Sequence, residues 1–164
     1  MIGSPVAVQG SRHERATALT RAGMLAAVVI GLDQLTKHTV PNGISLDQER
    51  NFIPLVKLTN VHNNGVAFNF LSGGGAIVLA FTLVALALLV SFLVLRPQRR
   101  WLWVPTGLLL GGALGNLIDR IANGYVTDFI KLPHWPAFNV ADMAITFGVI
   151  ALLLVLEVGS RRGD

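Results

Sequence analysis

Cysteine is absent from this chain of 164 residues, and charged residues are scarce. Without cysteine the protein forms no disulfide, holds no thiolate metal site, uses no thiolate nucleophile and carries no cysteine-linked lipid. Asp, Glu, Lys and Arg make up 13% of the residues, against about 25% in a typical soluble domain. Hydrophobic residues make up 52%, and the mean hydropathy is +0.60. This imbalance predicts an integral membrane protein.

Several motifs of common functional classes are also missing. The net charge of +4 does not indicate nucleic-acid binding, because the basic residues are scattered and form no stripe with aromatic residues. The chain has no Gly-x-Ser-x-Gly, which argues against a serine triad. It also lacks His-Glu-x-x-His, so we predict no metal and no cofactor. A metal site is kept as an alternative, since four candidate ligands fall on one predicted side: His62, His134, Asp128 and Asp142.

Four hydrophobic segments are long enough, or nearly so, to cross a bilayer, which takes about 20 apolar residues. The predicted spans are approximately 16–37, 76–95, 101–118 and 138–157. The first is the weakest, because its uninterrupted apolar run covers only 22–32, and it could be a signal peptide. The residues after that run, 33–37, offer no small-residue cleavage site, so we expect the segment to be retained.

The distribution of Lys and Arg sets the orientation of these spans. Eight of the 13 lie on the side of the two termini, and the other five lie on the opposite side, Lys37 at the end of the first span and four in the connections 38–75 and 119–137. Because cytoplasmic segments carry the excess of basic residues, both termini are predicted to be cytoplasmic. Residues 1–15 and 159–164 are predicted to be disordered ends of a single membrane domain over 16–158.

The longer outer connection contains a predicted β-element over 44–71. Residues 52–61 are rich in β-formers, 62–65 form a turn signal, and 66–70 return as a strand or lie at the interface. We therefore expect a small sheet lying on the bilayer. The predicted fold class is an all-α integral membrane protein with four transmembrane helices and this extracytoplasmic β-element between the first and second helices.

Polar and acidic residues gather at one predicted depth near the outer face. Asp33 lies near the end of the first span, Asn116 and Asp119 end the third, and Asn139 and Asp142 begin the fourth. At a rise of about 1.5 Å per residue, Asp142 lies only about 6 Å inside its span. Ionisable groups within a membrane are costly and commonly functional. The pattern therefore predicts one polar pocket that opens outward.

Two carboxylates, Asp128 and Asp142, flank the start of the last hydrophobic segment and suggest acid–base chemistry by a shared-proton pair. Structural roles are alternatives for both. Asn139 can be the N-cap of a helix whose third residue is Asp142. Asp128 can be an exposed loop acid or a partner of Lys131.

The remaining polar groups also have simpler interpretations. Asp33 and Lys37 can form an i,i+4 pair, and Asp119 and Arg120 an ion pair at the interface. A non-enzymatic carrier or assembly protein is the alternative function, with acids that serve packing or ion binding. A transport route needs polar groups along its whole length, whereas these acids gather at one end.

The motifs resemble those of the lipoprotein signal peptidase family, also called type II signal peptidase. The resemblance covers residues 20–158 and rests on five blocks in order. The blocks are Asp33-Gln34-x-Thr36-Lys37, Asn63-Asn64-Gly65-Val66-Ala67-Phe68, Gly111-Gly112-Ala113-x-Gly115-Asn116-x-x-Asp119-Arg120, Val126-Thr127-Asp128-Phe129-Ile130 and Phe138-Asn139-x-Ala141-Asp142.

The resemblance implies an aspartic endopeptidase of the bacterial cytoplasmic membrane, with its active site near the outer face, and we expect the protein to be a monomer. Its substrates would be prolipoproteins that carry a diacylglyceryl group, cut before the lipidated cysteine. The resemblance makes Asp128 and Asp142 the catalytic pair. It implies substrate-binding or supporting roles for Asn63, Gly112, Asn116, Arg120, Asn139, Asp33, Lys37 and Asp119. Prolipoproteins and membrane lipid are the expected partners, and nucleic acid and metal are not.

Overall fold

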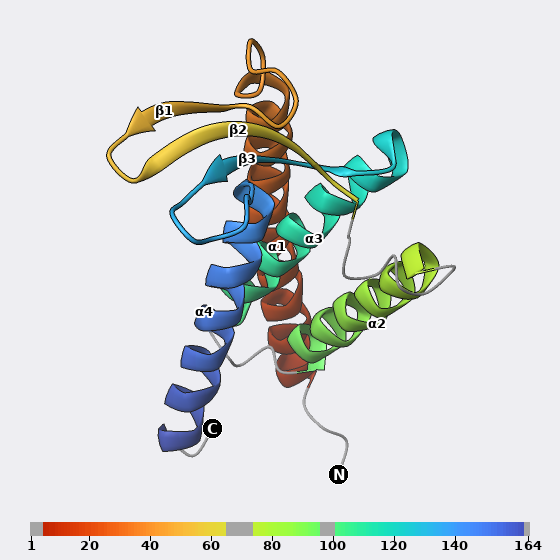
Figure 1. Cartoon of the computed structure of the whole chain (residues 1–164). Helices are drawn as coiled ribbons and strands as arrows, with labels where there is room; N and C mark the ends of the chain where they lie inside the picture. The colour runs from red at the N-terminus through yellow and green to blue at the C-terminus, as the bar shows by residue number, and fades with distance from the viewer. Residues whose placement is uncertain (1–4, 65–73, 96–100, 163–164) are drawn as a thin grey trace.

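The computed structural model describes residues 5–64, 74–95 and 101–162, and in these residues four helices carry a small sheet at one end (Figure 1). The helices are α1 (Pro5–Thr39), α2 (Gly74–Leu95), α3 (Trp103–Asn123) and α4 (Val140–Arg162). They follow the order of the four predicted hydrophobic segments. The molecule is mostly helical, as predicted.

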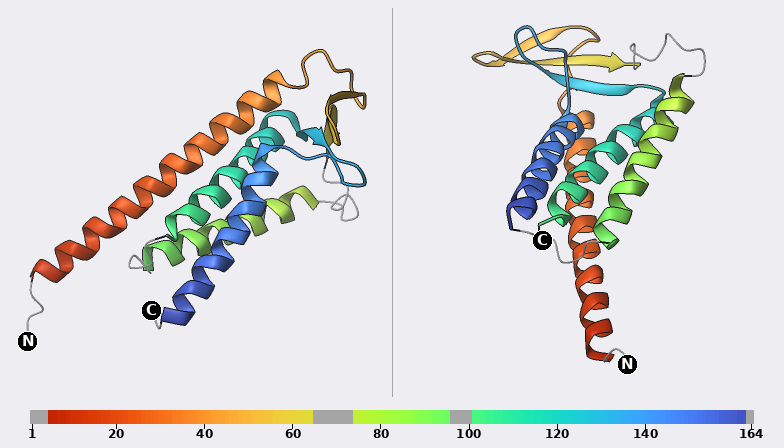
Figure 2. Two further views of the ribbon diagram at one scale, coloured as in Figure 1. Left: turned by 90° about the vertical axis from the view of Figure 1, so that its left-hand side faces the viewer. Right: turned by 90° about the horizontal axis from the view of Figure 1, so that it is seen from below.

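Two helices extend beyond their predicted ends. The prediction of disorder is wrong over 5–15, where α1 is already helical, and over 159–162, which continue α4. Pro5 suits the first position of a helix, where its missing N–H has no partner to lose, and no later proline interrupts α1. α1 has 35 residues, more than the roughly 20 that a bilayer needs, and its N-terminal end projects past the other helices (Figure 2).

The sheet has three antiparallel strands, β1 (Glu49–Ile53), β2 (Val56–Asn63) and β3 (Val126–Lys131), in the order β1-β2-β3. The predicted β-element supplied β1 and β2, whereas the second outer connection supplies β3, which the sequence analysis missed. An isolated hairpin is only marginally stable, and a third strand stabilises it. The predicted returning segment 66–70 lies outside the described residues. The sheet lies across one end of the helices (Figure 1).

A glycine directs the chain from α3 into β3. Gly124 follows the last residue of α3 with φ 80°, a left-handed conformation that glycine adopts without a steric penalty, and its N–H donates to the Arg120 carbonyl at 3.1 Å. β3 then begins two residues later and pairs with β2, so that Val61 lies opposite Asp128. This turn brings Asp128 back over the helices.

Small residues let α3 pack closely between α1 and α4. A Cβ atom at Gly111 would lie 2.6 Å from the Val29 Cβ of α1, and one at Gly112 would lie 2.5 Å from the Ala141 carbonyl oxygen of α4. Neither position has room for a larger residue. The first residues of α4, which include Asp142, are therefore held against the backbone of α3.

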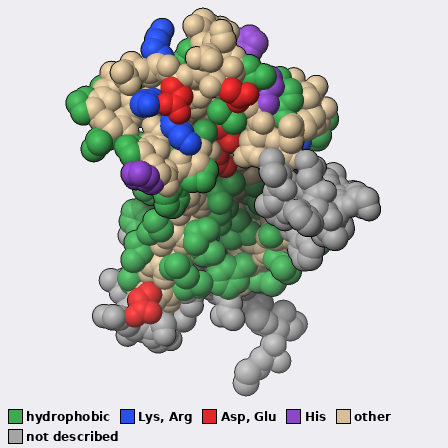
Figure 3. Space-filling view, viewed as in Figure 1, with side chains coloured by type: hydrophobic (Ala, Val, Ile, Leu, Met, Phe, Trp, Pro, Cys, Tyr) green, Lys and Arg blue, Asp and Glu red, His purple; other side chains and the backbone are tan. Residues whose placement is uncertain are grey.

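Apolar side chains cover the helices below the sheet, while charged side chains gather over the sheet (Figure 3). Among the exposed hydrophobic residues are Leu88 of α2 and Phe147 and Leu154 of α4. In the described residues, the helices over Arg12–Thr39 and Val140–Val158 are long and apolar enough to cross a membrane, and Leu83–Leu95 is a shorter apolar helix. This surface is that of a membrane protein.

Candidate functional site

The start of α4 is capped by two of the predicted site residues. The backbone N–H of Asp142 donates to Asn139 Oδ1 at 2.9 Å, and the backbone N–H of Asn139 donates to Asp142 Oδ2 at 3.2 Å. This reciprocal arrangement is a capping box, so the capping interpretation is confirmed. The cap does not use all of the Asp142 carboxylate, because its Oδ1 accepts a further hydrogen bond from Asn116 Nδ2 at 2.8 Å.

Asp128 is presented from β3 and is buried, with 2% of its surface exposed. Its carboxylate accepts hydrogen bonds from two asparagines, Asn63 Nδ2 to Oδ2 at 2.9 Å and Asn139 Nδ2 to Oδ1 at 2.7 Å. Among the described residues it forms no ion pair, so the suggested pairing with Lys131 is wrong. A buried carboxylate with amide donors only is an uncommon arrangement for a structural residue.

Asn139 joins the two carboxylates. Its backbone N–H and side-chain oxygen hold Asp142, and its side-chain amide donates to Asp128 and, at 3.1 Å, to Asn116 Oδ1. Asn116 in turn donates to Asp142. Asp128 and Asp142 therefore share one hydrogen-bonded cluster, although they come from β3 and α4.

A buried lysine lies behind this cluster. Lys37 Nζ is 2.8 Å from Asp33 Oδ2, 3.0 Å from Asp119 Oδ2 and 2.9 Å from Asn116 Oδ1. The predicted Asp33–Lys37 pair is thus confirmed. The suggested Asp119–Arg120 pair is wrong, since Asp119 pairs with Lys37 instead. The reason is that α1 and α3 bring these groups together in the interior, where an unpaired charge is expensive.

The two acids bound to Lys37 also hold the backbone beside each predicted catalytic residue. Asp33 Oδ1 accepts from the Ala141 N–H at 2.8 Å, one residue before Asp142. Asp119 Oδ2 accepts from the Thr127 N–H at 3.2 Å, one residue before Asp128. A single buried ammonium group therefore anchors both segments that carry the pair.

Burial raises the pKa of Asp128 to about 6, because an ionised carboxylate loses hydration in this environment. The hydrogen bond from Asn63 favours the charged form and opposes the shift, and the negative charge of Asp142 adds to it. The described network contains four carboxylates around one ammonium, those of Asp33, Asp119, Asp128 and Asp142. Excess negative charge of this kind favours binding of a proton.

The remaining predicted residues lie around the cluster. Gly112 has no functional group and acts by allowing α4 to approach α3. Arg120 is exposed, and its Nη1 donates to the Asn116 carbonyl at 3.4 Å. The alternative metal site does not assemble, since among the described residues no three His, Asp or Glu side chains are placed so that they could hold a metal ion, and His62 stacks on Tyr125 with ring centroids 3.7 Å apart.

Gln34 was missed as a site residue by the sequence analysis. Its Nε2 donates to Asp119 Oδ1 at 2.9 Å and to the Gly115 carbonyl at 3.2 Å, and so holds Asp119 beside Lys37. The available signal was its place in the polar run 33–37 at the end of a hydrophobic segment. A polar amide there needs a buried partner in a neighbouring helix.

Comparisons with known proteins agree on one family. The family model described as "Signal peptidase (SPase) II" matches residues 25–158. A lipoprotein signal peptidase of Moorella thermoacetica is 43% identical over 145 residues, which is 84% of this chain and 95% of the relative. One of Halothermothrix orenii is 36% identical over 145 residues, 86% of this chain and 98% of the relative. A solved bacterial membrane enzyme superposes with a TM-score of 0.77 at 33% identity and covers 86% of this chain and 92% of its own.

Proposed function

This chain belongs to the signal peptidase II family, aspartic peptidases that process prolipoproteins, and from that premise we propose that Asp128 and Asp142 are its catalytic pair. The observation that carries the proposal is the bridge of Asn139 between the two carboxylates. The carrier alternative is not favoured, because the relatives along most of the chain are peptidases.

The two carboxyl groups activate a water molecule while they share one proton. The ionised carboxylate accepts a proton from a water molecule, whose oxygen attacks the scissile carbonyl carbon, and the protonated carboxyl donates to the carbonyl oxygen. The gem-diol intermediate then collapses with cleavage of the C–N bond: the carboxyl that took a proton from water gives it to the leaving nitrogen, and the other carboxylate takes a proton back from a hydroxyl of the gem-diol. The pair titrates as a unit, so the proton belongs to both groups.

Asparagine and lysine keep this pair in position. Asn63 and Asn139 each donate to Asp128, and Asn116 donates to Asp142, so both carboxylates are oriented by neutral donors. Neutral donors orient a carboxylate without supplying the full positive charge that would prevent it from holding a proton. Lys37 contacts this cluster through Asn116, whose side-chain oxygen accepts a hydrogen bond from the lysine ammonium group.

We place the lipid part of the substrate in an apolar groove between α2, α3 and α4. The groove is lined by Leu89 and Phe92 of α2, Ala113 of α3 and Ile145 and Leu152 of α4, among others. Ala113 and Ile145 lie three residues from Asn116 and Asp142 respectively, so the groove starts about one helical turn from the pair. The acyl chains of a diacylglyceryl-modified cysteine would stay in this apolar space, with the bond before that cysteine at the carboxylates.

We also propose that α1–α4 cross the bacterial cytoplasmic membrane with both termini inside and the sheet on the outer surface. The acids then lie at the depth where the signal peptide leaves the bilayer, and water reaches them from outside. Since the chain has no cysteine, single cysteines test this topology directly. An impermeant maleimide should label Asn42→Cys in intact spheroplasts and Glu14→Cys only after permeabilisation. Labelling in the reverse order would overturn the topology.

The test of the catalytic pair is cleavage of a purified diacylglyceryl-modified prolipoprotein by Asp128→Asn and Asp142→Asn. Each variant should lose cleavage by several orders of magnitude while it stays folded. Asp47→Asn is the matched control, because Asp47 is exposed on the outer side and its φ of 59° suits asparagine. Wild-type turnover by either folded catalytic variant would remove that residue from the mechanism.

A further inference from the structure

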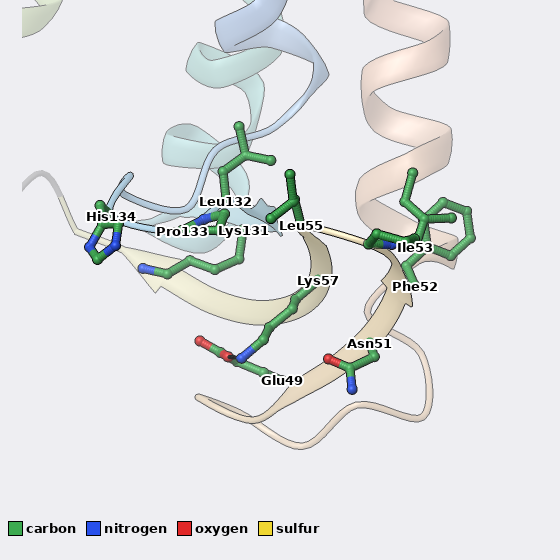
Figure 4. Close-up of a pocket in the computed structure, with 11 residues that line it drawn as sticks. Glu49, Asn51, Phe52, Ile53, Leu55, Lys57, Lys131, Leu132, Pro133 and His134 are labelled. Carbon is green, nitrogen blue, oxygen red and sulfur yellow. Dashed lines mark hydrogen bonds and ion pairs between the residues drawn. The ribbon is translucent and has the colours of Figure 1, made fainter.

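A second pocket of about 650 Å³ lies between the β1–β2 hairpin and the loop that follows β3 (Figure 4). Its lining includes Glu49 and Lys57 of the hairpin strands, Lys131 at the end of β3, and His134. None of the described lining residues belongs to the cluster around Asp128 and Asp142. The mechanism proposed above gives this pocket no role.

The pocket carries an excess of positive charge. Lys57 and Lys131 are directly opposed in the β2–β3 register, so their side chains project from the same face of the sheet. Like charges in this position repel each other unless an anion lies between them. One carboxylate is available, Glu49, whose Oε2 is 2.7 Å from Lys57 Nζ, and Lys131 forms no ion pair among the described residues. Two ammonium groups therefore share one carboxylate, which leaves a net charge of +1 at this place.

The tip of the hairpin beside these lysines is apolar and exposed. Phe52 is 63% exposed and Leu55 is 76% exposed. In Figure 4, Leu55 points toward the side on which the helices lie, whereas Lys57 and Glu49 point away from it. The apolar tip thus faces the side on which the helices lie, where lipid would surround α4, and the ionic groups face the opposite side. Figure 1 shows that the hairpin extends sideways beyond α4, so that no helix lies below its tip.

We propose that this pocket binds the headgroup of an anionic phospholipid of the outer leaflet, while the tip 52–55 inserts among the lipids. The phosphate sits between the apolar tip and the two opposed lysines and supplies the missing counter-charge. Basic pockets above an apolar surface recognise lipid headgroups by this combination of charge and insertion. The inference rests on the membrane orientation proposed above, because it places the sheet at the lipid surface.

Lipid retention tests the headgroup contact. The full chain, inactivated by Asp142→Asn, is reconstituted with phosphatidylglycerol and phosphatidylcholine, extracted in mild detergent and examined by native mass spectrometry. The parent should retain one phosphatidylglycerol. In the double variant Lys57→Gln/Lys131→Gln the signal of the lipid-bound species should be at least 10-fold weaker, which corresponds to a loss of binding free energy on the order of 1.4 kcal/mol. Arg50→Gln is the control, since Arg50 lies on the same strand as Glu49 but outside the lining of the pocket. Equal retention by the parent and the double variant, or equal loss in the control, overturns the headgroup site.

Fluorescence tests insertion of the tip. A sole cysteine at Leu55→Cys, labelled with an environment-sensitive dye in nanodiscs, should be quenched by a doxyl lipid and protected from iodide, and Arg50→Cys should show the opposite pattern. Iodide quenching of both positions overturns the insertion. Both measurements use the inactive, purified protein, in detergent for lipid retention and in nanodiscs that expose each face for fluorescence, so neither depends on cleavage or on the orientation in the cell. Failure of the lipid site is therefore distinguishable from failure of the proposed function.

Discussion

The side-chain amide of Asn139 lies 2.7 Å from the carboxylate of Asp128, and this contact fixes the distance between β3 and the first turn of α4. The same asparagine caps α4 through the backbone of Asp142. One side chain thus has a structural role that a sequence predicts and a bridging role that it does not. The two roles are separable by substitution, because serine is an equally good N-cap but is too short to bridge.

Asn139→Ser should therefore keep the fold and lose catalysis. We expect the free energy of unfolding to fall by only about 1–3 kcal/mol, because the cap is retained while the buried Asp128 carboxylate loses one donor. We expect kcat to fall at least 10²-fold, on the order of the loss of one oriented donor in an active site. Cleavage assays in detergent measure kcat, and thermal unfolding measures the change in stability. Asn139→Ala should lose both stability and kcat, and a serine variant with near-normal kcat would show that the bridge is dispensable.

Lys37 should be the most important charged residue for stability. Lys37→Met leaves the buried carboxylates of Asp33 and Asp119 without their partner, which costs about 3–5 kcal/mol. Lys57→Met is the control, since the Lys57–Glu49 pair is exposed and such pairs contribute less than about 1 kcal/mol. Titration with a denaturing detergent measures the free energy of unfolding of both variants. Equal losses in the two variants would contradict the role assigned to the buried pair.

Gly112 should tolerate no side chain. In Gly112→Ala the new Cβ meets the Ala141 carbonyl oxygen at 2.5 Å, so α4 must move away from α3, and we expect a loss of about 1–3 kcal/mol. Activity should fall as well, because Asp142 follows Ala141. The matched control is Gly31→Ala in α1, whose new Cβ has nothing within 4 Å and which should gain roughly 0.5–1 kcal/mol. A neutral Gly112→Ala would show that the two helices are not in close contact.

The pH profile should report the raised pKa of Asp128. Below about pH 6 the pair holds one proton, and above it that proton is lost, so the singly protonated pair and the cleavage rate decline as the pH rises through that value. In Asn63→Ala the charged carboxylate loses a donor that favours it. The pKa of Asp128 then rises, and the decline moves to higher pH.

The control for this shift is Asp47→Asn, an exposed acid that should leave the profile unchanged. The measurement is kcat/KM for the lipidated substrate between pH 4.5 and 9, with the protein in one detergent throughout. A shift of Asn63→Ala to lower pH would mean that Asn63 does not donate to an ionised Asp128.

Two predicted contacts agree with the structure, and in both the pattern is local. The capping box at Asn139 and the Asp33–Lys37 pair are both contained within five residues of sequence, and both are present. The boundaries of α1 and α4 were predicted too short, because hydropathy marks the part of a helix that suits lipid rather than the point at which helical hydrogen bonding ends.

The amino-acid sequence by itself determined the membrane-protein class, the helical segments and the placing of the acids at one end of them, because hydropathy and charge act over a few turns of helix. Only the tertiary structure decided that Asn63 and Ala141 meet groups 65 and 108 residues away, and that β3 joins the sheet. Those contacts depend on which segments pack together, and a polar residue does not carry in its neighbours any record of its distant partner. The buried network of Lys37, Asn116 and Asn139 is the result of that packing.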